Sequence, residues 1–159
     1  MTTREELIDG FQMIIREGLR VAATSGPDDW SYQVHDEDAG WTVKQTFCHL
    51  TATADIVPGF VGAMAQTAEG ENTAANLDVD AFNAQQISSR EGMSEPELME
   101  AFKASHEKLI DFIRGMPEEQ LAQRRRFGAI AGPVVHIMAT SLVLHGLSHI
   151  YHTTNRPLN

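Results

Sequence analysis

The chain has 159 residues, which suits one domain built around one hydrophobic core. Its hydrophobic content of 42% is typical of a soluble globular protein. The 22 acidic residues outnumber the 12 basic ones and give a formal charge of −10, which opposes binding to nucleic acid or to an anionic membrane surface.

The cysteine content and the distribution of apolar residues indicate where the protein is located. Cys48 is the only cysteine, so the chain can form no internal disulfide. The first residues, MTTREELIDGFQ, lack the apolar stretch of a secretory signal, and no run is expected to span a membrane. We therefore expect a single domain over residues 1–159 in the cytoplasm.

The N-terminal third predicts one helix followed by an irregular segment. Apolar residues recur at helical spacing over residues 3–24, and Thr3 can cap the first turn. The segment 30–41 carries several acids and both tryptophans, Trp30 and Trp41. Large aromatic side chains in a connection indicate that it covers one end of the core.

A second helix is predicted over residues 43–66, with Thr42 as its N-cap. Pro58 falls inside this pattern and either kinks the helix or ends it early, because proline removes a backbone hydrogen bond. Residues 67–77 are small and polar and predict a loop. A short helix should follow over residues 78–90.

Two further long helices complete the pattern. Ser94 is a good N-cap for a helix over residues 95–114, and Glu97 completes a capping box. Residues 122–133 predict a loop, and the final helix should run over residues 134–153.

Four long amphipathic helices without a convincing strand predict an all-α fold, an antiparallel four-helix bundle. The long connection over residues 67–94 also permits a crossover, so the helix order stays open. The basic run Arg124 to Arg126 is interpreted as a solvated loop or helix end and not as a phosphate site.

The last helix contains a cluster of histidines, His145, His149 and His152, at spacing i, i+4 and i+7. In an α-helix the first two lie about 40° apart around the axis and roughly 6 Å apart along it, so one metal ion can take both. A third ligand has to come from elsewhere, and His49 on the second helix is the best donor. Three imidazoles leave one coordination position open, as in catalytic zinc sites.

Alternative roles remain open for each of these side chains. The histidine pair can be exposed or hydrogen-bonded in the core, and His152 can be a fourth ligand, a general base or an exposed helix-end residue. His106 lies on the apolar stripe of its helix and is interpreted as a satisfied core group. Cys48 lies about 100° around the helix from His49 and is interpreted as buried packing. Neither His35 nor His136 has a supporting pattern.

Four segments together resemble the DinB-like superfamily over nearly the whole chain. They are WTVKQTFCHL (41–50), DVDAFNAQQ (78–86), SEPELMEAFKASHEKLIDFI (94–113) and HGLSHIYH (145–152). This superfamily includes mycothiol-dependent maleylpyruvate isomerases and bacillithiol transferases. Its pattern of Trp-Ser/Thr, a histidine some eight residues later and a final H-x3-H pair maps onto Trp41-Thr42, His49, His145 and His149.

The resemblance implies an up-down-down-up four-helix bundle that binds one divalent metal, either zinc, nickel, iron or manganese, and often forms a homodimer. It implies an enzyme that activates a low-molecular-weight thiol for transfer or isomerisation, or else water for hydrolysis, with a small-molecule substrate. The alternative is a non-catalytic member that binds a small ligand or serves as a structural dimer.

Overall fold

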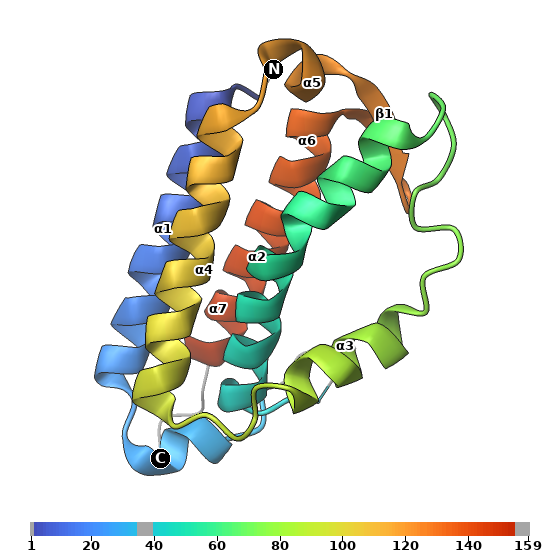
Figure 1. Ribbon diagram of the computed structural model, residues 1–159. Coiled ribbons are helices and arrows are strands. Elements are labelled where there is room, and N and C mark those ends of the chain that lie inside the picture. The colour runs from blue at the N-terminus through green and yellow to red at the C-terminus, as the bar shows by residue number, and fades with distance from the viewer. Residues whose placement is uncertain (1, 35–39, 155–159) are drawn as a thin grey trace.

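The protein is described by a computed structural model over residues 2–34 and 40–154 (Figure 1). Three long helices are α1 (Arg4–Thr24), α2 (Val43–Gln66) and α4 (Glu95–Gly115). The fourth is continuous and consists of α6 (Val134–Met138), the π-helix η2 (Ala139–Leu144) and α7 (His145–Thr154). Shorter elements are the 3-10 helix η1 (Pro27–Ser31), α3 (Val79–Ser88), α5 (Glu118–Ala122), β1 (Arg124–Phe127) and β2 (Ile130–Pro133).

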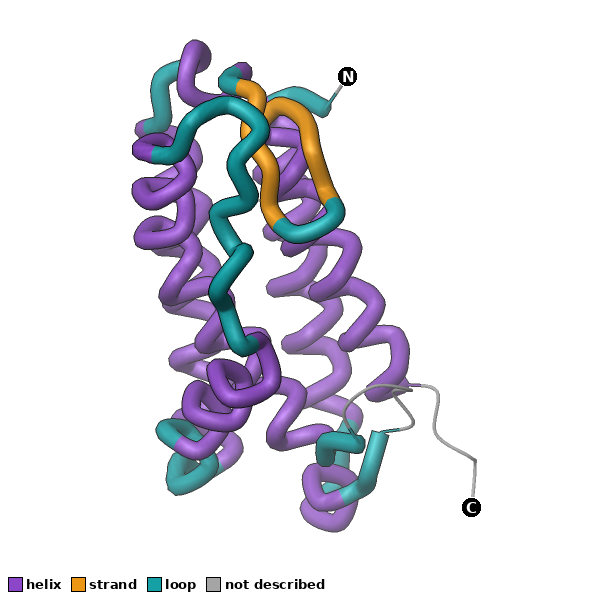
Figure 2. Tube along the Cα trace, turned by 90° about the vertical axis from the view of Figure 1, so that its right-hand side faces the viewer, coloured by secondary structure: helices purple, strands orange, loops and turns teal. Residues whose placement is uncertain are grey.

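The four long helices form the predicted bundle with a crossover. In Figure 1, α1 and the C-terminal helix run down the bundle while α2 and α4 both run up it. This is the up-down-down-up order that the resemblance implied. The parallel pair α2 and α4 is possible because the connection between them, which contains α3, returns along the length of the bundle (Figure 2).

The helix starts follow the capping signals in the sequence. At α1 and α2 the N-cap hydroxyl accepts from the amide of the third helical residue, whose side chain accepts from the N-cap amide. At α4 the Ser94 amide and hydroxyl both donate to the Glu97 carboxylate. The predicted pairs Thr3 with Glu6 and Ser94 with Glu97 are confirmed. Thr42 is confirmed as an N-cap, and Gln45, which was not predicted, completes its capping box.

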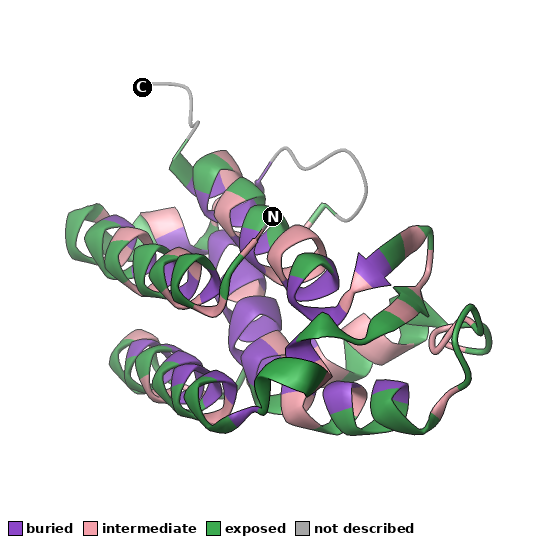
Figure 3. Ribbon diagram, turned by 90° about the horizontal axis from the view of Figure 1, so that it is seen from above, coloured by how far each residue is buried: buried purple, intermediate pink, exposed green. Residues whose placement is uncertain are grey.

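The core lies where the buried faces of the four helices meet (Figure 3). The rings of Phe47 and Phe102 meet edge to face at 5.4 Å and are fully buried. Trp30 in η1 packs on Phe47 at 5.5 Å and covers one end of the core, as expected for a tryptophan in a connection.

Pro58 does not end α2, which continues to Gln66. A proline at this position has no amide hydrogen to donate to the carbonyl of Ala54. In Figure 1 the C-terminal half of α2 leans away from the other long helices, consistent with a proline bend.

The prediction of a loop over residues 122–133 was wrong. Most of this segment forms a two-stranded antiparallel hairpin, in which Arg124 pairs with Pro133 and Phe127 with Ile130. Strands of four residues are too short to show a clear alternation of apolar and polar residues. Gly128 has a φ of 60° and begins the two-residue turn, as type II′ turns prefer. Arg125 donates to the Met64 carbonyl at 2.7 Å, so part of the basic run is structural.

The expectation that no segment reaches the length of a membrane span needs correction. By length and composition alone, Val43–Gln66 and Val134–Thr154 both qualify. Within the bundle, 56% and 44% of their apolar windows are buried. Their apolar character is explained by burial against the other helices of the core.

Candidate metal centre

Three histidines from two helices converge on one point. His49 comes from α2, and His145 and His149 come from α7. The Nε2 atom of His145 lies 3.3 Å from that of His49 and 3.0 Å from that of His149. Among the residues described, these three offer ligand atoms that all lie within 4.8 Å of one another. The structure therefore brings together the three predicted metal ligands.

The two distances from His145 Nε2 fit the ligand spacing of a tetrahedral metal site. With metal–nitrogen bonds of about 2.0–2.1 Å, tetrahedral geometry separates the nitrogen atoms by roughly 3.3 Å. Two direct hydrogen bonds explain the spacing less well. A ring nitrogen carries either one proton or one lone pair, so His145 Nε2 cannot form good hydrogen bonds to both neighbours. One cation in the centre of the three nitrogen atoms satisfies all of them.

Burial divides the centre into a closed side and an open side. His49 and His149 are 6% and 7% exposed, whereas His145 is exposed. The pKa of His49 is lowered to about 3, mainly by burial and to a smaller extent by the electrostatic effect of His149 and His145. His49 is therefore neutral near pH 7, the form that binds metals. A small molecule would reach the centre from the side of His145.

Trp41 packs against the closed side. Its ring centroid lies 4.7 Å from that of His49 and 5.7 Å from that of His149. One indole therefore contacts two of the three imidazoles and restricts their orientation. Its position directly before the N-cap Thr42 and eight residues before His49 was the only signal in the sequence, and this contact could not be predicted from it.

The π-helix η2 ends directly before His145 and was also missed. The Ser141 hydroxyl donates to the Ile137 carbonyl at 2.6 Å, the acceptor that a regular α-helix offers to the Ser141 amide. Such insertions in an α-helix occur often at functional sites. Just beyond it, a Cβ added to Gly146 would lie 2.9 Å from Ile14 Cδ1, so this glycine allows α7 to approach α1 closely.

None of the other candidates, among the described residues, belongs to the group of three histidines. His106 is buried, and its Nδ1 lies 2.7 Å from the Phe102 carbonyl, which agrees with a satisfied core group. Cys48 is buried, and burial raises the pKa of its thiol to about 11. His136 is exposed, and His35 lies outside the described residues. His152 contacts Tyr151 at 5.8 Å, and its role as a general base stays a prediction.

The fold and the site define a class. A four-helix bundle in this order, with three histidines between its second and last long helices, is the DinB-like arrangement. The sequence profile of the mycothiol maleylpyruvate isomerase N-terminal domain matches residues 11–147. The chain belongs to this family. Comparison with curated protein sequences finds no match.

Solved structures support the same fold. The mycothiol-dependent maleylpyruvate isomerase superposes with a TM-score of 0.67 at 14% identity over 96% of this chain. The chain spans 60% of the length of that protein. YfiT from Bacillus subtilis, described as a probable metal-dependent hydrolase with an unusual four-helix bundle topology, gives 0.65 at 13% identity over 95% of this chain and 83% of its own. The sibling lethal factor precursor DfsB gives 0.73 at 12% identity over 97% and 94%.

Proposed function

We propose that the protein is a metal-dependent enzyme whose His49, His145 and His149 hold one divalent ion. The convergence of the three imidazoles, with Nε2 separations of 3.3 Å and 3.0 Å from His145 to the other two, carries this proposal. Zinc, nickel, iron and manganese all accept imidazole ligands, and the donor set does not select one of them. A further ligand of this ion would approach from the exposed side of His145.

The open position suits a small nucleophile. A divalent ion there supplies the positive charge that keeps a thiol or a water molecule deprotonated near neutral pH. His49 remains neutral because burial lowers its pKa, and Trp41 packs against both His49 and His149. His152, one turn beyond His149, is proposed as the base that accepts the proton of the nucleophile.

Two reaction types fit this centre. The name of the family supports transfer or isomerisation with a low-molecular-weight thiol, and the description of YfiT supports hydrolysis by water. We favour the thiol, because the family profile covers most of the chain. In a transfer, the thiolate sulfur forms a bond to an electrophilic carbon, and the leaving group departs with its electron pair. The homodimer and the cytoplasmic location stay predictions.

Enzyme assays test this proposal. Protein loaded with each of the four metals is mixed with mycothiol, bacillithiol or glutathione and a chromogenic aryl halide. His149→Ala should abolish metal retention and thiol consumption together. His136→Ala, on the exposed surface of the same long helix, should retain both. A fully metallated and active His149→Ala variant would overturn the assignment. A protein that binds apolar compounds but no metal would instead support the non-catalytic alternative.

A further inference from the structure

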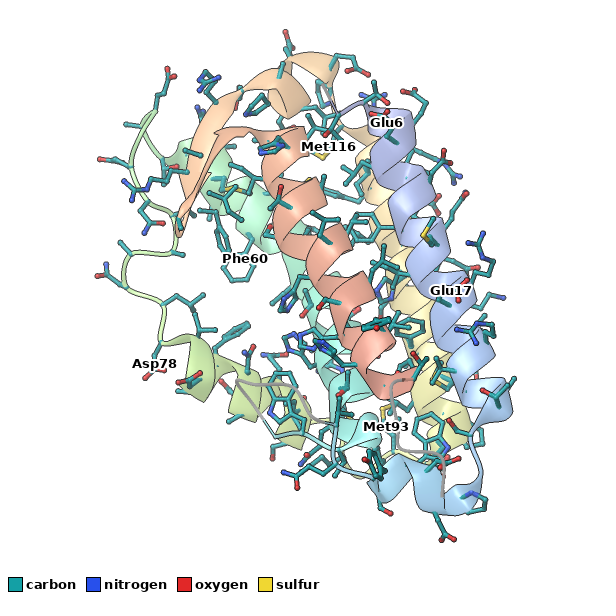
Figure 4. The ribbon with its side chains drawn as sticks, turned by 180° about the vertical axis from the view of Figure 1, so that it is seen from behind. Glu6, Glu17, Phe60, Asp78, Met93 and Met116 are labelled. Atoms are coloured by element: carbon teal, nitrogen blue, oxygen red, sulfur yellow. The ribbon has the colours of Figure 1, made fainter. Side chains whose placement is uncertain are left out.

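A small apolar pocket lies next to the metal centre. It lies between the C-terminal half of α2, β1 and the C-terminal helix. Its walls include Val57, Phe60 and Met64 from α2, Phe127 from β1, and Met138 and Leu142 from the C-terminal helix. Figure 4 shows the Phe60 ring on the side of α2 that faces α3 and the long connection.

Aromatic rings form the outer wall of this apolar pocket. Phe60 meets Phe127 at 5.8 Å and Phe82 of α3 at 6.0 Å, both close to edge to face. The three rings join α2, the hairpin and the long connection, so two irregular parts of the fold meet here. Phe60 and Phe127 line the pocket, and Phe82, which does not, packs against Phe60.

The chemistry of the lining favours an uncharged group. None of the nine described residues around the pocket is titratable, and eight of them are apolar. The ninth, Ser141, already donates its hydroxyl proton to the Ile137 carbonyl. A carboxylate or an amine placed here would lose its hydration without gaining a charged partner, which disfavours its binding.

Two side chains in the wall of the apolar pocket bring it close to the metal centre. Val57 and Leu142 also line a second, smaller space, whose walls include His106, His145 and Gly146. Leu142 precedes His145 by one turn of the same helix. Leu142 therefore places the wall of the pocket within one helical turn of His145, within reach of an apolar end of a molecule that reacts there.

The volume limits the size of that end. The apolar pocket has a volume of about 30 Å³. A water-sized group needs about 10–15 Å³, so the pocket has room for roughly two or three such groups, the size of a short alkyl chain. A longer or branched chain would have to displace Val61 or Met138.

We propose that the apolar pocket binds the short, uncharged alkyl end of the electrophilic substrate, while its reacting carbon lies beside His145. This inference rests on the proposed function, because it places the tail relative to the nucleophile. The thiol, with its polar groups, occupies the solvent side of the centre. The preferred electrophile is thus a small neutral molecule and not a dicarboxylate.

Methionine methyl NMR tests the pocket directly, because two of the seven methionines, Met64 and Met138, line it. Protein with labelled methionine methyl groups is titrated with the unreactive amides from acetamide to hexanamide. The shifts should appear at Met64 and Met138 and be absent at Met13, which is exposed on α1. Affinity should rise about fourfold per added methylene until the pocket is full. The corresponding carboxylates should bind at least tenfold more weakly.

Val61 is a buried residue in the wall of the pocket, and two variants of it should change the volume of the pocket in opposite directions. Val61→Leu should weaken butyramide binding roughly tenfold by filling the space. Val61→Ala should move the best chain length to a longer amide. Circular dichroism verifies that both variants fold. Equal affinities in all three proteins, or equal shifts at Met13, would overturn the proposal.

The two proposals fail in different ways. Titration of metal-free protein reports on the pocket alone, and metal content reports on the proposed function alone. In protein loaded with paramagnetic cobalt, protons near the amide carbonyl should relax faster than those of the terminal methyl group. The opposite order, or no binding to metal-free protein, would contradict the proposed placement of the tail even if the metal centre is confirmed.

Discussion

The Nε2 atoms of His49 and His145 lie 3.3 Å apart, although 96 residues separate the two histidines in the chain. His49 lies on α2, which runs up the bundle, and His145 lies on α7, which runs down it (Figure 1). The centre therefore exists only when these two helices are packed together. Any ion that binds all three histidines must favour the folded state over the unfolded state.

Metal binding should therefore raise the free energy of unfolding. A divalent ion present at about 100 times its dissociation constant adds about 2.7 kcal/mol, seen as a higher Tm. Thermal unfolding followed by circular dichroism, with zinc and then with excess chelator, measures this difference. His49→Ala should remove the effect of zinc while His136→Ala keeps it. A wild-type Tm that does not respond to any of the four metals would contradict the coupling.

Removing the indole of Trp41 should weaken metal binding without removing a ligand. Trp41 contacts both His49 and His149, so its loss lets these rings reorient and admits water. Outer partners of metal ligands typically change affinity by 10–100-fold, and we expect about tenfold for Trp41→Ala. Trp41→Phe should restore most of the affinity because it keeps an aromatic face. Competition with a chromogenic chelator gives the dissociation constants, and unchanged affinity in Trp41→Ala would show that the packing is incidental.

The metal-free protein should lose stability as the pH falls below about 6.5. Burial lowers the pKa of His49 to about 3 and that of His106 to about 4. In the unfolded chain both imidazoles bind a proton near pH 6.5, whereas in the folded chain they stay neutral. Protonation below about pH 6.5 therefore stabilises the unfolded state relative to the folded state. The contribution of these two histidines to the free energy of unfolding is fully present above about pH 6.5. It is lost as the pH falls from there to the folded-state pKa values of about 4 and about 3. Each histidine contributes about 1.4 kcal/mol per pH unit over its range.

His106→Phe tests that slope, since it removes one titrating group and keeps a ring between Phe11 and Phe102. Urea unfolding of chelated protein between pH 4.5 and 6.5 should show a pH dependence shallower by about 1.4 kcal/mol per unit. A slope equal to that of the wild type would show that His106 does not remain neutral in the fold.

Two glycines in long helices should respond to alanine in opposite ways. A Cβ at Gly18 would lie 2.7 Å from the buried Phe102 ring, so Gly18→Ala should destabilise the protein by about 1–3 kcal/mol. A Cβ at Gly62 meets nothing within 4 Å, so Gly62→Ala should stabilise it by about 0.5–1 kcal/mol. Chemical denaturation measures both. A stabilising Gly18→Ala would contradict the close packing of α1 against α4.

Local signals in the sequence predicted most of the fold. Apolar spacing and the N-caps Thr3, Thr42 and Ser94 located the long helices correctly, because these signals act within one or two turns. The spacing of His145 and His149 predicted their shared face for the same reason. The order of the helices came from the family resemblance, since helix spacing is compatible with several connections.

The missed features depend on contacts between distant parts of the chain. The two hairpin strands show no alternation of apolar and polar residues in the sequence. Arg125 is held by a hydrogen bond to the Met64 carbonyl of α2, which is distant in the chain. The sequence named His49 as the best third ligand but could not show that α2 packs against α7. That packing is what brings His49 next to His145 and His149. The apolar pocket combines α2, β1 and the C-terminal helix, so no single segment predicts it.

The measurement that tests the metal centre most directly is metal content by inductively coupled plasma mass spectrometry. Untagged protein is purified without chelator, beside the variants His145→Ala and His136→Ala, and circular dichroism verifies that all are folded. We predict about one divalent ion per chain in the wild type and in His136→Ala, and its loss in His145→Ala. Equal metal content in both variants, or no metal in any folded sample, would contradict the three-histidine centre.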